Sequence, residues 1–292
     1  MDYQVFHPVL DTYGAPVLIV SFVLLLLLQY RWPLRRWVKG MGWRCLTNAG
    51  VAVPTFVVVR LVLIPAELAV AYWAAQHEVG LLYLASLPGW LHGVFAFLLL
   101  DYLLYVWHWL SHQIPFLWRF HNVHHTDLDL GVTTAFRFHF GEMLLSAFFR
   151  VAGVLLIGAG PVAVLVHEVV FEASVAFHHS NWRLPFWLER PLSWVIVTPR
   201  MHGIHHSIVQ RETNSNYSNM FNLWDRLHRT IRLNVSQDDI VVGVPGYNKD
   251  GYDHTLVGLL TLPFRRQKAY WTLWDGTQPD RHEEGSRDKL AP

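Results

Sequence analysis

Residues 101–112 read DYLLYVWHWLSH, an apolar run that ends in two histidines four residues apart. On an α-helix, residues i and i+4 lie on the same face, so His108 and His112 can reach one ion. The chain contains several other apolar runs long enough to span a bilayer. The stretch therefore predicts an all-α, polytopic membrane protein with a metal site where this helix leaves the bilayer.

Three more histidine clusters follow, and together the four clusters hold ten of the eighteen histidines. They are His121, His124 and His125; His178 and His179; and His202, His205 and His206. Imidazole is the commonest protein ligand for a transition metal, and ten are too many for one ion and suitable for two. The two triplets, spaced i, i+3 and i+4, can supply ligands to neighbouring ions. Zinc, copper, iron and nickel all suit imidazole, so the clusters alone leave the metal open.

Composition narrows the class of protein. The 292 residues are 52% hydrophobic and only 15% charged, which favours an integral membrane protein. The net charge of +1 and the lack of a known DNA- or RNA-binding motif argue against a nucleic-acid partner. One cysteine cannot hold a four-cysteine iron–sulfur cluster, and no Gly-x-Gly-x-x-Gly loop is present. Electrons for any redox reaction must therefore come from a separate donor.

Five apolar runs predict the membrane segments, at 13–30, 51–73, 91–105, 143–159 and 161–176. Lys and Arg cluster after the first run, are absent from 74–89, and are absent between Arg150 and Arg183. By the positive-inside rule this places all four histidine clusters on the cytoplasmic side. Gly158 to Pro161 predicts a turn between the last two runs. Residues after about 181 predict a cytoplasmic cap that folds against the membrane face.

The motifs resemble those of the sterol desaturase/fatty acid hydroxylase superfamily. The resemblance covers residues 99–231 and includes the segments 101–112, 118–125, 179–181, 198–206, 216–219 and 224–227. It implies a membrane-bound di-iron oxygenase that uses O2 and external electrons to hydroxylate, desaturate or demethylate a lipid from the bilayer. Three regions are expected along the chain: an N-terminal transmembrane region (1–90), a fatty acid hydroxylase-like di-iron domain (91–270) and a polar, disordered tail (271–292).

By the same resemblance the metal ligands would be His108, His112, His121, His124, His125, His179, His202, His205 and His206. His178 is an extra candidate beside His179. Adjacent helical residues point about 100° apart, so only one of the two is expected to bind a given ion. The His-x-Asn pattern of the family favours His179.

Five residues are expected to support the ligands, since a metal-bound histidine usually donates its second N–H to a carboxylate or carbonyl. They are Asp101, Asp127, Glu142, Glu172 and Asn181. Asp101 and Glu172 each lie seven residues before a histidine, two helical turns away on the same face. Arg60 and Glu67, also seven apart, are expected to form a structural ion pair.

Other interpretations stay open. The same scaffold could catalyse desaturation, sterol methyl oxidation or ether-lipid cleavage, as an ether-lipid monooxygenase. A non-catalytic membrane metal-binding or transport protein is a second alternative, although a transporter would place its ligands near the bilayer midplane. A membrane zinc hydrolase is a third, but it would need only about three protein ligands and a general base.

Overall fold

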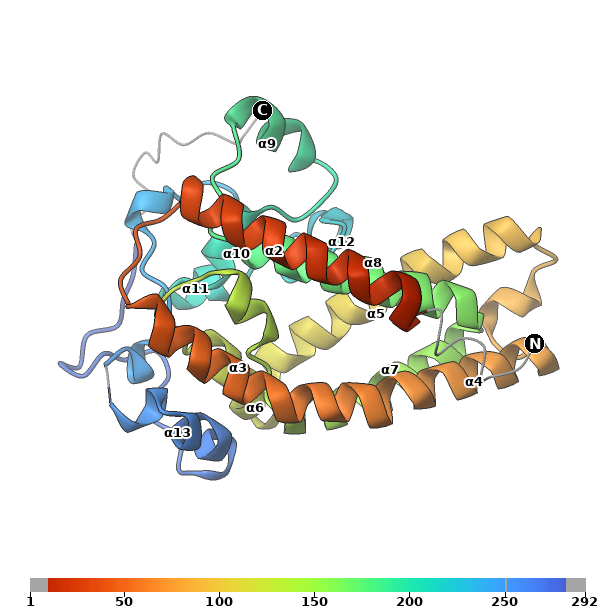
Figure 1. Ribbon diagram of the computed structural model, residues 1–292, viewed down its shortest axis with the longest axis horizontal. Helices are drawn as coiled ribbons and strands as arrows, with labels where there is room; N and C mark the ends of the chain where they lie inside the picture. Colours follow the sequence, from red (N-terminus) through yellow and green to blue (C-terminus); the bar gives the residue numbers. More distant parts are fainter. Residues whose placement is uncertain (1–9, 250, 282–292) are drawn as a thin grey trace.

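The computed structural model describes residues 10–249 and 251–281, and this part of the chain is helical (Figure 1). It contains no β-strand within the described ranges, where β-pairing is limited to isolated bridges such as Ser207 with Val242. The long helices are α2 (Ala15–Arg31), α3 (Met41–Val58), α4 (Ile64–His77), α5 (Gly89–Gln113), α7 (Phe140–Ile157) and α8 (Pro161–His179). The all-α fold predicted from the sequence is confirmed.

Five helical stretches of the described chain are long and apolar enough to cross a membrane. They are Thr12–Arg31, Gly42–Leu84, Gly89–Gln113, Phe140–Ile157 and Pro161–His179. Four of the five predicted apolar runs lie within these stretches, and the run 143–159 extends two residues past Ile157 into the turn. The chain is therefore a multi-pass membrane protein, as its composition predicts.

The second stretch is longer than the predicted run. Helix α3 continues into α4 through a π-helical segment, Val59–Leu63, and Figure 1 shows the two helices as one curved rod. Pro54 lies inside α3, where a proline removes a helical hydrogen bond. A π segment adds one residue to a turn, so the helix is deflected without ending. From Met41 to His77 the rod is about 55 Å long at about 1.5 Å per residue, so its first turns reach beyond a single crossing.

A buried ion network joins three of the membrane helices. Arg150 on α7 donates from Nε to Oε1 of Glu67 on α4 at 2.8 Å, and it also binds Glu168 on α8. Glu67 therefore pairs with Arg150. Arg60 lies inside the π segment, and its expected pairing with Glu67 stays a prediction.

The turn between α7 and α8 lies where the sequence predicts it. Helix α7 ends at Ile157, Gly158 takes a left-handed conformation with φ of 76°, and α8 begins at Pro161. Gly80 packs against this turn, because a Cβ on Gly80 would lie 2.3 Å from the Gly158 Cα atom. Only glycine fits at this contact.

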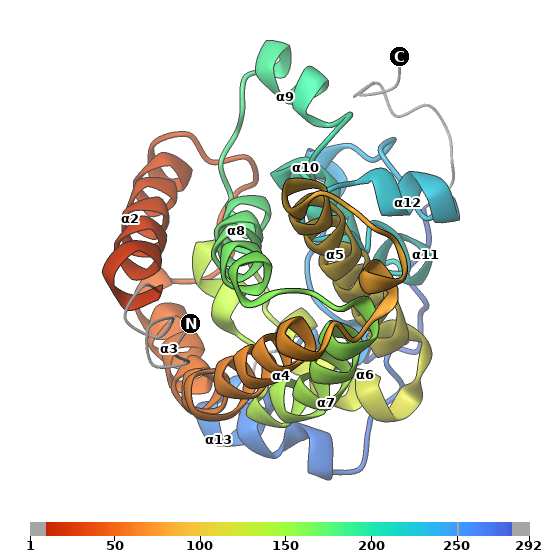
Figure 2. The same cartoon turned by 90° about the vertical axis from the view of Figure 1, so that its right-hand side faces the viewer.

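Shorter elements gather toward one end of the long helices and form the cap (Figures 1 and 2). They include α6 (Pro115–His125), α9 (Phe186–Leu192), α10 (Pro199–His205), α11 (Gln210–Thr213), α12 (Leu223–His228) and α13 (Leu256–Thr261). Residues 271–281, predicted as part of a polar tail, contact this cap: the Trp271 ring stacks on Trp118 and Arg281 pairs with Glu212. The rest of that predicted tail, 282–292, lies outside the described residues.

Candidate metal centre

The four histidine clusters meet where α5 and α8 end against the cap. Helix α5 carries His108 and His112, and Ile114 and Pro115 then start α6 in a new direction. Pro115 suits a first helical position because it has no N–H to leave unpaired. Helices α6, α8 and α10 bring the other clusters to the same place. For example, the ring centroids of His125 and His206 are 4.3 Å apart.

Nine of the ten clustered histidines form two groups whose nitrogen atoms lie within 4.8 Å of one another. The first group is His108, His112, His121, His125 and His205; the second is His124, His179, His202 and His206. His178 lies outside both groups, with its ring centroid 4.1 Å from that of His202. Of the adjacent pair, His179 is thus the residue that joins a group.

Each histidine triplet divides between the two groups. On α6, His121 and His125 belong to the first group and His124 to the second. At α10, His205 belongs to the first group, whereas His202 and His206 belong to the second. Residues one turn apart share a face and their neighbour points elsewhere, so each short helix supplies ligands on two sides.

Carbonyl oxygen atoms fix two rings of the first group, those of His108 and His205, by one nitrogen. Nδ1 of His108 lies 2.7 Å from the Tyr217 carbonyl, and Nδ1 of His205 lies 2.7 Å from the Ser215 carbonyl. Such contacts leave the proton on Nδ1 and the lone pair on Nε2. The Nε2 atoms of His121 and His205 are buried and have no hydrogen-bond partner among the described residues.

The second group cannot be explained by hydrogen bonds alone. Nε2 of His179 lies 3.0 Å from Nε2 of His124 and 2.9 Å from Nε2 of His202. A neutral ring nitrogen has one N–H or one lone pair, so it cannot make both contacts as hydrogen bonds. Nδ1 of His179 already donates to the Val175 carbonyl at 2.8 Å, which leaves its Nε2 with a lone pair. Converging lone pairs fit a bound cation.

The charge state of the cap histidines also suits a metal. Burial and the neighbouring rings hold the pKa well below its usual value for His124, His125, His202 and His206. Burial lowers the pKa of His205 to about 3. These rings are neutral at pH 7, which is the form that binds a metal.

Comparison with known proteins agrees with this arrangement. Residues 93–230 match the model of the fatty acid hydroxylase family, and this range holds all ten clustered histidines. This part of the chain belongs to the sterol desaturase/fatty acid hydroxylase superfamily. No solved structure matches the chain significantly.

Several curated hydroxylases and monooxygenases are similar to the chain. An ornithine lipid hydroxylase of Rhizobium tropici is 30% identical over 60% of this chain and 50% of its own length. Human cholesterol 25-hydroxylase is 30% identical over 48% of this chain and 51% of its own length. Alkylglycerol monooxygenase of Xenopus tropicalis is 29% identical over 46% of this chain and 29% of its own length. The chain thus spans about half of these relatives, or less.

Of the five expected supporting residues, Glu142 contacts a histidine of this superfamily motif. Its Oε1 atom lies 2.8 Å from Nδ1 of His121, and both side chains are buried. A carboxylate in this position orients the ring and makes its other nitrogen a better ligand.

Replacing Glu142 with alanine should weaken metal binding about 10- to 100-fold, the range typical for loss of such a partner. The measurement is metal retained per chain during titration with a chelator. Glu78 lies just past the far end of α4, and Glu78→Ala serves as the control with unchanged retention. Equal retention in the Glu142 variant would show that the carboxylate does not support the His121 ligand.

The other four expected residues have different surroundings. Asp101 accepts hydrogen bonds from the Trp224 indole and the Phe221 amide, so it anchors the chain that follows the Tyr217 carbonyl. Asn181 binds both backbone groups of Arg35. Glu172 lines a cavity, and the Val175 carbonyl, a turn closer to His179, occupies the Nδ1 atom that Glu172 was expected to hold. The side chains of Asp101 and Glu172 are too short to reach a histidine two helical turns away, a distance of about 11 Å along the axis. A shared helical face is therefore not enough to predict such a contact.

Asp127 holds cationic side chains in place of a histidine. It accepts hydrogen bonds from Arg44 at 2.8 Å, Asn48 at 3.0 Å and Thr134 at 2.8 Å. Burial alone would raise its pKa, but the charges of Arg44 and Arg137 hold the pKa of Asp127 well below its usual value. The predicted N-terminal region and the predicted di-iron domain are therefore joined by a buried ion pair.

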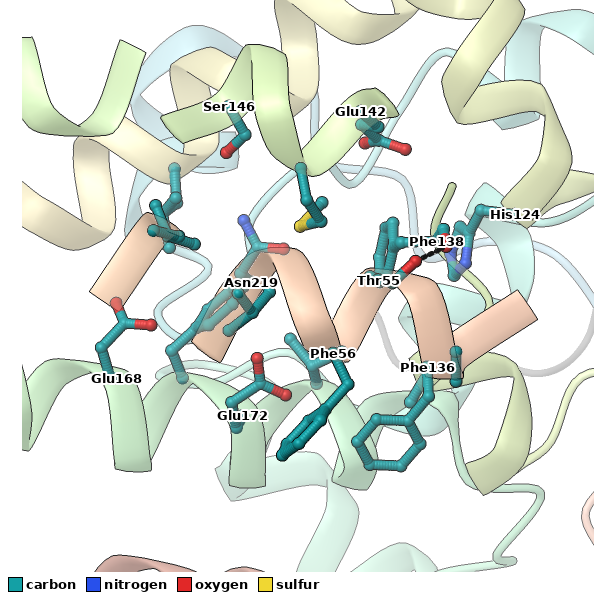
Figure 3. Close-up of a pocket in the computed structure, with 18 of the residues that line it drawn as sticks. Thr55, Phe56, His124, Phe136, Phe138, Glu142, Ser146, Glu168, Glu172 and Asn219 are labelled. Atoms are coloured by element: carbon teal, nitrogen blue, oxygen red, sulfur yellow. Dashed lines mark hydrogen bonds between the residues drawn. The ribbon is translucent and has the colours of Figure 1, made fainter. Parts of the chain in front are cut away.

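A cavity of about 620 Å³ leads from the histidines into the helical bundle. His108 and His121 of the first group and His124, His179 and His202 of the second line it, and most of its wall is apolar. Figure 3 shows His124 at one side of the cavity, next to Phe138. Several lining residues, among them Thr55, Ser146 and Asn219, were not predicted from the sequence. For Asn219 the one available signal was its place in a segment that resembles the family.

Proposed function

We propose that this protein is a membrane-bound di-iron oxygenase that hydroxylates or desaturates a lipid with O2 and external electrons. The observation that carries the proposal is the continuity between two buried histidine groups and a mostly apolar cavity among membrane helices. Cavities of this volume suit small-molecule ligands with long apolar parts.

The nine grouped histidines would hold two iron ions, five imidazoles on one and four on the other. When bound, the iron supplies the activation of O2 that oxidation of an unactivated C–H bond requires. In hydroxylation one oxygen atom enters the C–H bond and the other leaves as water, with two electrons and two protons taken up. The single cysteine supports a separate protein as the source of electrons.

The cavity would position the lipid and exclude water. Phe138 stacks on His124 with ring centroids 4.3 Å apart, and Thr55 binds the Phe138 carbonyl at 2.5 Å. These contacts form a rigid apolar wall beside the second group. A lipid that enters from the bilayer would bring a C–H bond to this wall, where few water molecules compete.

The distribution of Lys and Arg supports a cytoplasmic position for the metal centre. Arg119 and Arg137 lie near the histidines, whereas the loop after α4 has neither Lys nor Arg up to Gly89. A cytoplasmic site would be accessible to a cytoplasmic electron donor.

The similar proteins support a lipid as substrate, since their names specify an ornithine lipid, cholesterol and alkylglycerol. Ether-lipid oxidation is the second candidate, favoured by the match to alkylglycerol monooxygenase. It differs in product, because an oxidised ether carbon gives cleavage to an aldehyde. The cavity that ends at the histidines argues against a metal-binding protein without catalysis.

Metal analysis combined with lipid profiling in ¹⁸O2 tests the proposal. We expect about two iron ions per chain and a host lipid that gains one ¹⁸O atom, or loses two hydrogens, only when the protein and a reductant are present. Anaerobic incubation is the control. An iron-loaded, reduced protein that changes no lipid of the membrane in which it is expressed would contradict the proposal.

A further inference from the structure

Three polar side chains line the middle of the cavity from three different segments. Ser146 lies on α7, Glu172 on α8, and Asn219 in the chain before α12. Figure 3 shows all three directed into the cavity between Glu168 on one side and His124 on the other. We name Ser146, Glu172 and Asn219 the polar belt.

The side chains of the polar belt have no hydrogen-bond partner among the described residues. Ser146 is only 2% exposed, and no carbonyl of its own helix takes its hydroxyl proton. Ser111 on α5 shows the usual alternative, since its hydroxyl donates to the Trp107 carbonyl at 2.9 Å. A buried polar group without a partner is costly in an apolar setting. Ser146 is such a group, and the partly exposed Glu172 and Asn219 face the same cavity. Together the three side chains indicate a place for the polar part of a ligand.

The charges around the belt favour a donor. Arg150 already binds Glu67 and Glu168, so its donors are engaged one turn away from Glu172. The cavity lining holds two cations, Arg60 and Arg150, and three carboxylates, Glu142, Glu168 and Glu172; a fourth carboxylate, Glu67, binds Arg150 behind it. A hydroxyl or an amine can donate to the Glu172 carboxylate, whereas an acidic headgroup would be repelled.

Helix geometry sets the distance from the belt to the metal centre. Glu172 precedes His179 by seven residues on one helix, which is about 10 Å at about 1.5 Å per residue. Ser146 follows Glu142, the partner of His121, by four residues, or about 6 Å on the same basis.

We propose that the polar belt binds a hydrogen-bond-donating group, a hydroxyl or an amine, on the lipid substrate about 10 Å from the carbon that is oxidised. The inference rests on the proposed function for the reaction at the histidines. Beyond that function, the inference says that the substrate carries a polar group within the apolar part of the membrane. By binding this group, Glu172 selects which carbon of the lipid reaches the metal centre.

The test measures binding of three probes of equal length: hexadecan-1-ol, hexadecylamine and hexadecane. Iron-loaded full-length protein in detergent is compared with Glu172→Leu, Glu172→Gln and the control Val170→Leu, which lies on the membrane-facing side of α8 and is 40% exposed. Native mass spectrometry gives the bound probe, and metal analysis of the same samples gives the iron content.

We expect the wild type and the control to bind the alcohol, the amine or both about tenfold more tightly than hexadecane, and Glu172→Leu to lose that preference. The probe that the wild type prefers over hexadecane identifies the group as a hydroxyl or an amine, and Glu172→Gln should keep binding of the alcohol but weaken binding of the amine, because an amide still accepts a hydrogen bond but carries no charge. Ser146→Ala gives a second reading should Glu172→Leu not fold, with weaker binding of the same probe.

An unchanged preference in both Glu172→Leu and Ser146→Ala would overturn the inference, as would a wild type that binds the three probes equally. Loss of iron from the wild type would instead defeat the proposed function, because the probe comparison does not require turnover. The two failures are therefore distinguishable.

Discussion

Replacing His124 with alanine is expected to abolish activity and to remove about one metal ion per chain. His124 is one of four imidazoles in the second group, so its loss leaves three. His205→Ala leaves four imidazoles in the first group and should lose less metal, but it should also abolish activity because both ions take part in the proposed reaction. Metal content by mass spectrometry and product formation from lipid measure the two effects.

His77→Ala is the matched control for these variants. His77 lies at the far end of α4, where its Nδ1 atom contacts the Trp73 carbonyl at 2.9 Å. Its removal should leave metal and activity unchanged. Full metal content in both His124→Ala and His205→Ala would disprove the assignment of the two histidine groups as metal sites.

Replacing Asp127 with asparagine should lower the free energy of unfolding by about 3–5 kcal/mol, the usual cost of breaking a buried ion pair on one side. Arg44 and Arg137 would lose the counter-charge that both share. Since the pKa of Asp127 is depressed, its contribution is complete above the ordinary carboxyl pKa of about 4. It is lost only as the pH falls toward the depressed value, so the difference between the proteins should be constant from about pH 6 to pH 8.

Denaturant unfolding in detergent measures this difference, with Asp238→Asn in an exposed turn as the control. Metal per folded chain should stay at the wild-type level, since the side-chain hydrogen bonds of Asp127 go to Arg44, Asn48 and Thr134 and not to a histidine of either group. A variant of wild-type stability that loses metal would instead assign Asp127 to the support of a ligand.

Local spacing explains why much of the centre could be predicted. His108 and His112, four residues apart, must share a helical face, and the triplets at 121–125 and 202–206 follow the same rule. The apolar runs likewise fix the membrane helices, because a bilayer requires about 20 apolar residues for each crossing. Neither inference depends on which other segment lies nearby.

The partners of the ligands depend on packing and could not be predicted. The backbone carbonyls of Tyr217 and Ser215 accept hydrogen bonds from His108 and His205. Because every residue has a backbone carbonyl, the sequence does not show which one will contact a histidine. Asp101 and Asn181 were expected beside histidines and bind other segments instead. Their partners are more than a hundred residues away, where the sequence offers many equivalent donors.

Periodicity within single segments is enough to predict a helical membrane protein with clustered imidazoles at helix ends. The division of nine histidines into groups of five and four, and the apolar cavity with a polar belt that leads to them, became visible in the folded chain alone. Those properties arise where segments distant in the chain pack together, and packing is decided by the sum of many weak contacts that no local pattern records.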